Sequence, residues 1–351
     1  MNTFLPATDE LSKHINHQAD ELFRRMQALD VQSLEIPEQC RWYLGVSHMN
    51  RLFFSIETSA HLLYRAIKKK GISIGETILM DYGAGVGSLY MLAKLCGCKR
   101  VIYNDHLHDW MISARTISEA CNIHIDQFIV GDIEHTMGEL QRDGVRCDII
   151  ASRNVIEHIY DLKKFFNIIY SFSPDTLVYS STTANNANPA SRLKHYLLHR
   201  KLEKQYKEQR LQRILKEGIS GNEACKLATA TRGLAMEDLT NAIKTFKQTK
   251  QVRSNREPAL NTCDPSNGVW AEHILPFDEY RKLVDQTKYS ISFEAGFWDT
   301  HYSKSWKNLF ANTMNAIRYL GKNIALMTAP FIYVIAEPIL KNSNPSKYDR
   351  H

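Results

Sequence analysis

The sequence lacks the cysteine patterns of a zinc site and of a disulfide framework. Its seven cysteines are an odd number, and no two of them stand in a CxxC pair. Cys96 and Cys98 are the tightest pair, separated by a single glycine. Because free cysteine is among the most buried residue types, we interpret these residues as ordinary core cysteines in a reducing compartment.

Long apolar runs are also missing. Pro330, Glu337 and Pro338 interrupt the most apolar late stretch, 324–340, which is shorter than the ~20 residues of a spanning helix. Residues 1–10 carry acids but no basic flank or apolar run, unlike a signal peptide. We therefore expect a soluble, cytoplasmic protein without a transmembrane segment. The net charge of +6 suits an anionic partner without requiring one.

What the sequence does contain is an alternation of elements. Residues 8–70 have the apolar spacing of helices. After them, short apolar runs alternate with helical stretches, and the expected strands are 77–81, 100–104, 127–130, 147–151 and 177–180. Such alternation predicts parallel strands joined by right-handed crossovers. Two later strands, at 289–293 and 331–336, complete the expected sheet. The fold class is therefore α/β, with a doubly wound, mostly parallel, seven-stranded sheet.

The alternation is interrupted by a polar, helix-rich segment without a strand pattern. Within 191–213 there are eight Lys or Arg residues against two Glu. We expect four regions: N-terminal helices at 1–72, the sheet domain at 73–190 and 266–340, a basic helical insertion after the fifth strand at 191–265, and a tail at 341–351.

The sharpest motif is the glycine-rich turn that follows the first expected strand. Asp81 is followed by glycines at 83, 85 and 87, and a helix begins at once. Glycines let the backbone approach a ligand closely, and a helix N-terminus offers unpaired N–H groups. The spacing differs from Gly-x-Gly-x-x-Gly of dinucleotide-binding turns, because Ser88 stands where the last glycine is required.

This motif resembles that of the class I S-adenosylmethionine-dependent methyltransferases, which have a Rossmann-like fold. Three further segments match the family in order: a second strand ending at Asp105, a third followed by Asp132 and Ile133, and a fourth leading into 154–158. The resemblance covers 75–183 and, weakly, 271–338. It implies that the glycine turn holds the methionine part of the cofactor, Asp105 the ribose, and Asp132 with Ile133 the adenine.

The cofactor-binding residues that the resemblance implies are Asp81, Tyr82, Gly83, Ala84, Gly85, Gly87, Asp105, His106, Asp132, Ile133 and Asn154. Structural interpretations remain open for three of them. Asp105 and Asp132 are also suitable helix caps, because Asp is a favoured N-cap residue. Tyr82 is also explained by packing alone.

The segment 154–158 resembles the ubiquinone-biosynthesis O-methyltransferase branch and its small-molecule relatives. A related Glu-x-x-Glu-His pattern with a later His binds a divalent metal in small-RNA 2′-O-methyltransferases. Here Asn154 stands at the first Glu position, which puts a metal on Glu157, His158 and His273 in doubt. The alternatives are His158 or His273 as general base, with Glu157 beside them, or a structural role for these side chains.

The resemblance thus implies transfer of a methyl group from S-adenosylmethionine to an oxygen or nitrogen atom, by in-line displacement. We expect a small, polar or anionic acceptor, bound next to the basic insertion, with His as base or orienter. The alternatives are a metal-assisted RNA methyltransferase and a non-catalytic cofactor-binding protein; the charge is confined to one run, which argues against nucleic acid. The sequence does not specify the acceptor or the oligomeric state.

Overall fold

The computed structural model describes residues 2–252, 254 and 261–339. A seven-stranded sheet with the order β3-β2-β1-β4-β5-β7-β6 forms its centre. The strands are β1 (Ile78–Tyr82), β2 (Arg100–Asp105), β3 (Gln127–Val130), β4 (Ile149–Arg153), β5 (Leu177–Thr182), β6 (Tyr289–Ala295) and β7 (Ile332–Pro338). β1 to β5 pair in parallel, whereas β7 runs antiparallel to both of its neighbours. The predicted α/β class with a mostly parallel seven-stranded sheet is confirmed.

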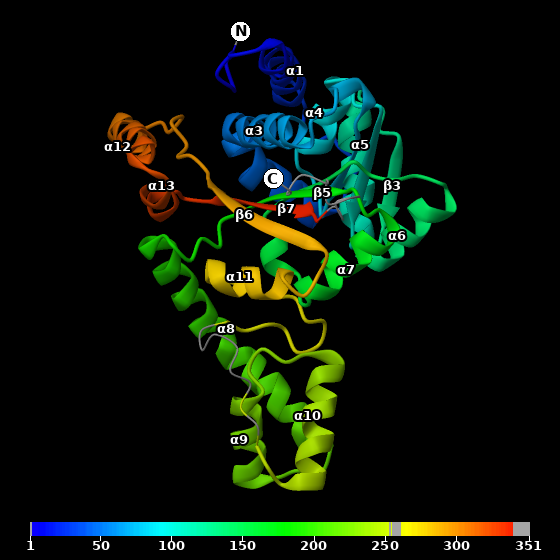
Figure 1. The fold of residues 1–351 in the computed structure, drawn as a ribbon, viewed down its shortest axis with the longest axis vertical. Helices are drawn as coiled ribbons and strands as arrows, with labels where there is room; N and C mark the ends of the chain where they lie inside the picture. Colours follow the sequence, from blue (N-terminus) through cyan, green and yellow to red (C-terminus); the bar gives the residue numbers. More distant parts are fainter. Residues whose placement is uncertain (1, 253, 255–260, 340–351) are drawn as a thin grey trace, which may run out of the picture.

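Alternating side chains of the strands build a core on each face of the sheet. Leu79 and Val101 contribute to one core, whereas the next residues, Met80 and Ile102, contribute to the other. Helices α4 (Leu89–Leu95) and α5 (His108–Ala120) lie on the first face, and α6 (Ile133–Arg142), α7 (Leu162–Phe172) and α11 (Phe277–Val284) lie on the second (Figure 1). Both surfaces of the sheet are therefore covered.

The N-terminal region is helical, as predicted, and its helices extend the core on the first face of the sheet. Helix α1 (Glu10–Gln27) begins with a capping box between Asp9 and Ser12. Gly71, with φ of 75°, ends α3 (Leu52–Lys70) by donating its backbone N–H to the Ile67 carbonyl. Between them lie α2 (Glu38–Trp42), a π-helix at Tyr43–His48 and a 3-10 turn at Met49–Arg51. The periodicity gave no sign of the π-helix.

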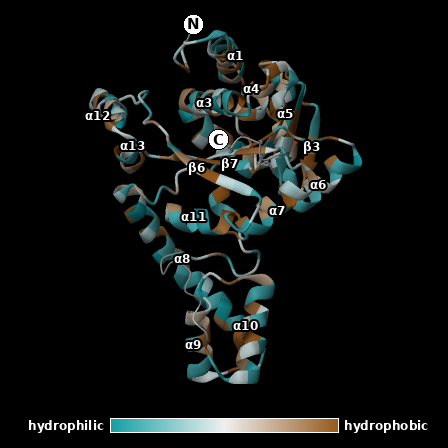
Figure 2. Ribbon diagram, in the orientation of Figure 1, coloured by the Kyte–Doolittle hydropathy of each residue, from teal (hydrophilic) through white to brown (hydrophobic). Residues whose placement is uncertain are grey.

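After β5 the chain forms three helices that project below the sheet domain in Figure 1: α8 (Pro189–Lys216), α9 (Gly221–Ala230) and α10 (Met236–Thr249). They share a small core of their own that includes Ile214, Leu227 and Phe246. Figure 2 shows that α8 is largely hydrophilic, as its sequence suggests. One of the nine Lys and Arg residues of this helix, Arg210, is nevertheless buried and paired with Glu203. The domain boundaries stay a prediction, and the predicted tail 341–351 lies outside the described residues.

Two helices between β6 and β7 were not predicted. They are α12 (Ser305–Ile317) and α13 (Lys322–Thr328), joined by a 3-10 turn at Arg318–Leu320. Figure 1 places both at one edge of the molecule. In the part of the chain that the structure describes, no helix combines the length and the apolar character needed to cross a bilayer.

Candidate functional site

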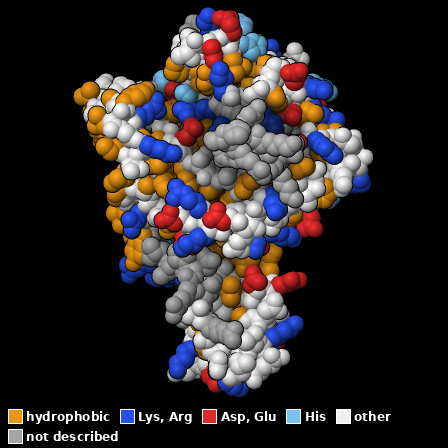
Figure 3. Space-filling view, in the orientation of Figure 1, with side chains coloured by type: hydrophobic (Ala, Val, Ile, Leu, Met, Phe, Trp, Pro, Cys, Tyr) orange, Lys and Arg blue, Asp and Glu red, His pale blue; other side chains and the backbone are white. Residues whose placement is uncertain are grey.

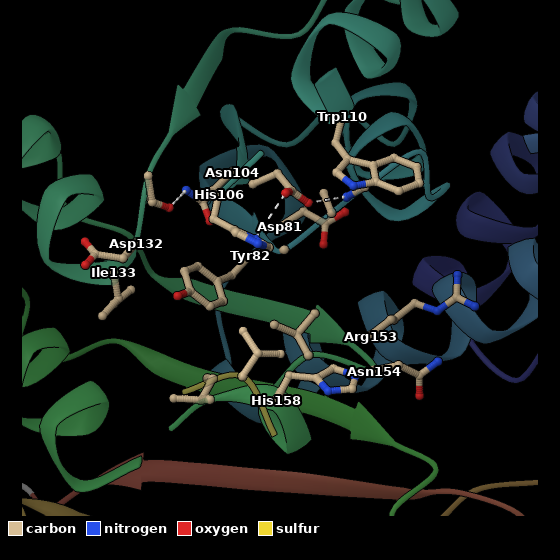
Figure 4. A pocket seen from close by; sticks show the side chains of 18 of the residues that line it. Asp81, Tyr82, Asn104, His106, Trp110, Asp132, Ile133, Arg153, Asn154 and His158 are labelled. Atoms are coloured by element: carbon tan, nitrogen blue, oxygen red, sulfur yellow. Dashed lines mark hydrogen bonds and ion pairs between the residues drawn. The ribbon is translucent and has the colours of Figure 1, made fainter. Parts of the chain in front are cut away.

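A cavity of about 770 Å³ lies at the carboxyl ends of the parallel strands (Figure 4). The residues that line it include the last residues of β1, the ends of β2 and β4, and the loop after β3. The chain passes from β1 to β2 and β3 on one side, and β4 then pairs with β1 on the other. In open α/β sheets ligands bind at such a reversal of strand order, outside the carboxyl ends of the strands.

The glycine-rich turn forms one wall of this cavity. Gly83 and Gly85 have φ values of 65° and 53°, in the left-handed region that favours glycine. The backbone N–H of Gly87 donates to the Ala84 carbonyl at 2.9 Å, which closes the turn. A Cβ atom on Gly83 would lie 2.7 Å from the Val155 side chain, whereas one on Gly85 would meet no atom within 4 Å. The turn therefore combines tight packing on one side with open space on the other.

The carboxylate of Asp105 is directed at this turn from the end of β2. Its Oδ2 atom accepts a hydrogen bond from the Gly85 backbone N–H at 3.0 Å, and its Oδ1 atom accepts one from the Leu107 N–H at 3.0 Å. His106 lies beside it, with Nδ1 3.5 Å from Asp105 Oδ1. The residue that precedes Asp105, Asn104, is buried and donates its side-chain amide to Gly131 and Thr136. These bonds hold the end of β2 in place against the turn and the β3 loop.

Asp132 and Ile133 line the far end of the cavity. Asp132 is also the N-cap of α6, because its Oδ1 atom accepts a hydrogen bond from the His135 backbone N–H at 2.9 Å. The capping role considered from the sequence therefore exists alongside a position in the cavity wall. Tyr82 likewise has two roles: it lines the cavity, and its ring packs on Phe165 with the two ring centroids 5.4 Å apart.

A buried carboxyl group, Asp81, and a half-buried cation, Arg153, flank the foot of the turn. Burial raises the pKa of Asp81 to about 7, and the positive charge of Arg153 opposes that shift. The Tyr90 backbone N–H donates to Asp81 at 3.0 Å. Arg153, at the end of β4, donates from Nη1 to the Ser55 carbonyl and side chain and to the Ser59 hydroxyl, at 2.9–3.1 Å. Figure 4 shows its side chain extending toward the N-terminal helices, so it ties α3 to the sheet.

His158 lies on the cavity wall in the 3-10 turn at Ile156–His158. Its Nδ1 atom lies 2.8 Å from the Trp270 carbonyl oxygen. Because a carbonyl oxygen only accepts, this hydrogen bond places the proton of the neutral ring on Nδ1 and leaves Nε2 as an acceptor. Such a ring has the tautomer that a general base needs.

The other two predicted catalytic residues do not line the cavity. Glu157 is 1% exposed, and burial raises its pKa to about 8. Its carbonyl accepts the backbone N–H of His273 at 2.7 Å, and the His273 ring stacks on Trp270 at 4.0 Å. Both side chains are therefore in the wall behind His158. Asn154, by contrast, lines the cavity with a φ of 54°.

No group of three or more His, Cys, Asp or Glu side chains suited to a metal ion occurs among the residues for which coordinates are described. Glu157, His158 and His273 thus do not form such a group.

Sequence reasoning missed several wall residues that come from elements far away in the chain. Tyr43, His48 and Ser55 belong to the N-terminal helices, and Trp110 to α5. Burial lowers the pKa of His48 to about 3, so its ring is neutral near pH 7. Met236, at the start of α10, and residues 267–269 close the side next to His158. No local motif marks any of these residues; only the tertiary fold brings them to the cavity.

No protein-family model matches the chain, and no curated protein matches it. Among solved structures, the chain is similar to SMU.776, a candidate methyltransferase complexed with SAH, at 14% identity and a TM-score of 0.31 over 40% of this chain and 38% of that one. A candidate RNA methyltransferase from Pyrococcus horikoshii matches at 19% identity and a TM-score of 0.31, over 50% of this chain and 74% of that one. The ribosomal protein L11 methylase of Lactobacillus delbrueckii subsp. bulgaricus matches at 18% identity and a TM-score of 0.28. The match covers 36% of this chain and 60% of that one. This chain thus spans under two thirds of the first and third of these proteins.

Proposed function

We propose that this protein is an S-adenosylmethionine-dependent methyltransferase whose acceptor is a small, polar or anionic molecule. One observation carries the proposal: the carboxylate of Asp105 is directed at the Gly85 end of a glycine turn, across the wall of a cavity at the carboxyl ends of the strands. An amino-acid tail fits against the turn, and a carboxylate with two oxygens is suited to the paired hydroxyls of a ribose.

The residues present fit this cofactor in size and in chemistry. The volume of about 770 Å³ falls within the ~300–1,000 Å³ typical of small-molecule sites. The open space beside Gly85 lets a ligand approach the turn closely, and a side chain there would have to adopt a left-handed conformation. Asp132 and Ile133, which also line the cavity, offer a polar and an apolar contact for the adenine ring of the cofactor. In this assignment Asp81, Tyr82, Ala84, Gly87, His106 and Asn154 complete the cofactor-binding wall.

When bound, S-adenosylmethionine supplies a methyl group that its sulfonium has already activated. The protein then has to align the acceptor and exclude water. His158 is the residue we assign to the acceptor, because Nδ1 is engaged by the Trp270 carbonyl and Nε2 keeps its lone pair. An Nε2 atom of this kind removes the proton of an acceptor hydroxyl or orients an acceptor nitrogen. Glu157 and His273 support the segment behind His158, and we assign them positioning roles.

Two features favour a small acceptor with negative charge. Tyr43 and His48 from the N-terminal helices, and Met236 with residues 267–269, also line the cavity, so distant parts of the chain enclose it. The basic surface of α8 lies in the same insertion as Met236. No residue of α8 is among those that line the cavity, so its charges act on an acceptor at long range, where they favour a negative one. The assignment to the small-molecule O-methyltransferases rests only on the resemblance of residues 154–158 to that branch.

The proposal is tested by offering the protein methyl-labelled S-adenosylmethionine with two fractions of a cell extract, total RNA and molecules small enough to pass a dialysis membrane. We expect label in the dialysable fraction, with a yield that changes little with salt. Label in RNA alone, with transfer that falls steeply as salt rises, would overturn the small-molecule assignment, because release of counterions drives RNA binding.

A further inference from the structure

The two helices between β6 and β7 expose large apolar side chains. We use the name α12–α13 face for the exposed side chains of residues 304–327. Its most exposed apolar members are Trp306, Leu309, Phe310, Tyr319, Leu320 and Met327, with 48–79% of each accessible. Figure 3 shows hydrophobic side chains gathered at this edge of the molecule, where Figure 1 places α12 and α13. Contiguous exposed apolar surface of this kind marks an interaction site.

The fold does not need this face, because other atoms attach the helices to the sheet domain. Ala311 is the one buried residue of α12. The Asn315 side chain exchanges two hydrogen bonds with the backbone of Trp298, at 2.8 and 3.0 Å, and the Trp298 indole N–H donates to the Thr328 carbonyl at 2.9 Å. Of the six apolar side chains named above, Phe310 packs edge-on against the Trp298 ring, with ring centroids 5.4 Å apart, and each of the other five is more than half exposed.

Charge on the face has a single sign. No Asp or Glu occurs from residue 300 to residue 336, whereas Lys304, Lys307, Arg318 and Lys322 lie within the face or at its border. The acid that precedes this stretch, Asp299, is buried and pairs with Arg51 at 3.1 Å. Lys307 lies over the rings of Tyr302 and Trp306. Aromatic and aliphatic side chains are thus interspersed with cations.

A hollow of about 630 Å³ continues this face on the side of α11 and β6. Lys322, Leu326 and Met327 of α13 line it, together with the stacked rings of Phe277 and Phe293. Arg281 also lines it and pairs with Asp278 at 2.6 Å. The hollow therefore has an apolar floor with cationic side chains beside it.

We propose that the α12–α13 face docks the protein on an anionic phospholipid membrane surface. Surface-binding helices combine Trp, Phe and Leu with Lys and Arg, and anionic lipids attract such cations. A second copy of this chain fits the face poorly, because a two-fold interface would bring the same four cations together. Nucleic acid would satisfy the cations but leave the exposed Leu, Phe and Met side chains without partners.

The test is sedimentation of the full chain with vesicles of phosphatidylcholine alone, and of phosphatidylcholine with about one quarter phosphatidylglycerol. We expect the protein to sediment with the anionic vesicles and more weakly with the neutral ones. The double variant Leu309→Ser/Leu320→Ser should reduce the apparent affinity by about tenfold or more, because it removes apolar area that lipid would bury. The pair Lys304→Glu/Lys307→Glu should abolish the preference for anionic vesicles.

Leu197→Ser is the matched control, since Leu197 is a leucine on α8 with 54% of its surface exposed. It should leave vesicle binding unchanged, and thermal unfolding should be the same for all variants. Absence of the wild-type protein from the anionic pellet would overturn the proposal, as would equal sedimentation of the Leu309→Ser/Leu320→Ser variant. A self-association in size-exclusion chromatography that the double variant abolishes, without vesicle binding, would assign the face to a second copy instead.

Discussion

The carboxylate of Asp105, at the end of β2, accepts a hydrogen bond from the backbone N–H of Gly85 at 3.0 Å. These two residues belong to different strand–turn units, and their contact joins two segments that the sequence singled out separately. The contact fixes the Asp105 side chain beside the glycine turn, in the wall of the cavity.

Replacing Gly83 by Ala should weaken cofactor binding and lower stability. The new Cβ atom would lie 2.7 Å from Val155, and φ of 65° is unfavourable for any side chain. Gly97→Ala is the matched control, since Gly97 has φ of 80° but open space around its Cβ position. We expect the control to cost about 1–2 kcal/mol of unfolding free energy in urea and to leave titration with S-adenosylhomocysteine unchanged. Equal affinities of the Gly83→Ala and wild-type proteins would contradict this prediction.

Glu157→Gln should stabilise the protein, and by more at pH 8 than at pH 5. Burial raises the pKa of Glu157 to about 8 in the folded state, from an ordinary value of 4.5. Between these two values the folded state holds a proton that the unfolded state releases, so the stability of the wild type falls as pH rises. Gln carries no such penalty. The measurement is guanidinium unfolding at both pH values, with Glu119→Gln on the exposed surface as control. A gain that does not grow with pH would contradict the assignment of a buried, protonated Glu157.

His158→Ala should impair methyl transfer without impairing cofactor binding. A positioned general base contributes about 10²–10⁴-fold to a rate. We therefore expect a loss of that order in kcat, with affinity for S-adenosylhomocysteine nearly unchanged. His124→Ala, at an exposed position outside the cavity, should have neither effect. An active His158→Ala enzyme would remove His158 from the proposed mechanism.

The sequence predicted the sheet well because its signals are local. Each of the first five strands is a short apolar run, and each was placed within two residues of its observed bounds. The turn at 83–87 was recognised because glycine lacks a Cβ atom and adopts positive φ readily, so its presence alone indicates a tight turn. For Asp132 the sequence allowed two roles, a helix cap and a residue of the binding site, and in the structure it both caps α6 and lines the cavity.

Residues brought to the site by packing could not be predicted. His48 and Ser55 lie on elements that precede the sheet, and nothing in their neighbourhood distinguishes them from other core-facing positions. Glu157 and His273 were chosen for their chemical type, yet the direction of each side chain depends on tertiary contacts with Trp270 and the segment around it. Helices α12 and α13 were not predicted because most of their large apolar side chains face outward and only Ala311, Ala325 and Leu326 are buried. Their apolar spacing therefore does not mark a single buried face.

The most direct test of the account is calorimetric titration of S-adenosylhomocysteine into the wild-type protein and into Asp105→Ala. We predict binding to the wild type and an affinity about ten- to hundred-fold lower for the variant, since a hydrogen bond to a charged group contributes about 1.5–3 kcal/mol. Asp109→Ala, at a neighbouring exposed carboxylate, should bind as the wild type does. Failure of the folded wild-type protein to bind, or undiminished binding by a folded Asp105→Ala variant, would contradict the proposed cofactor site.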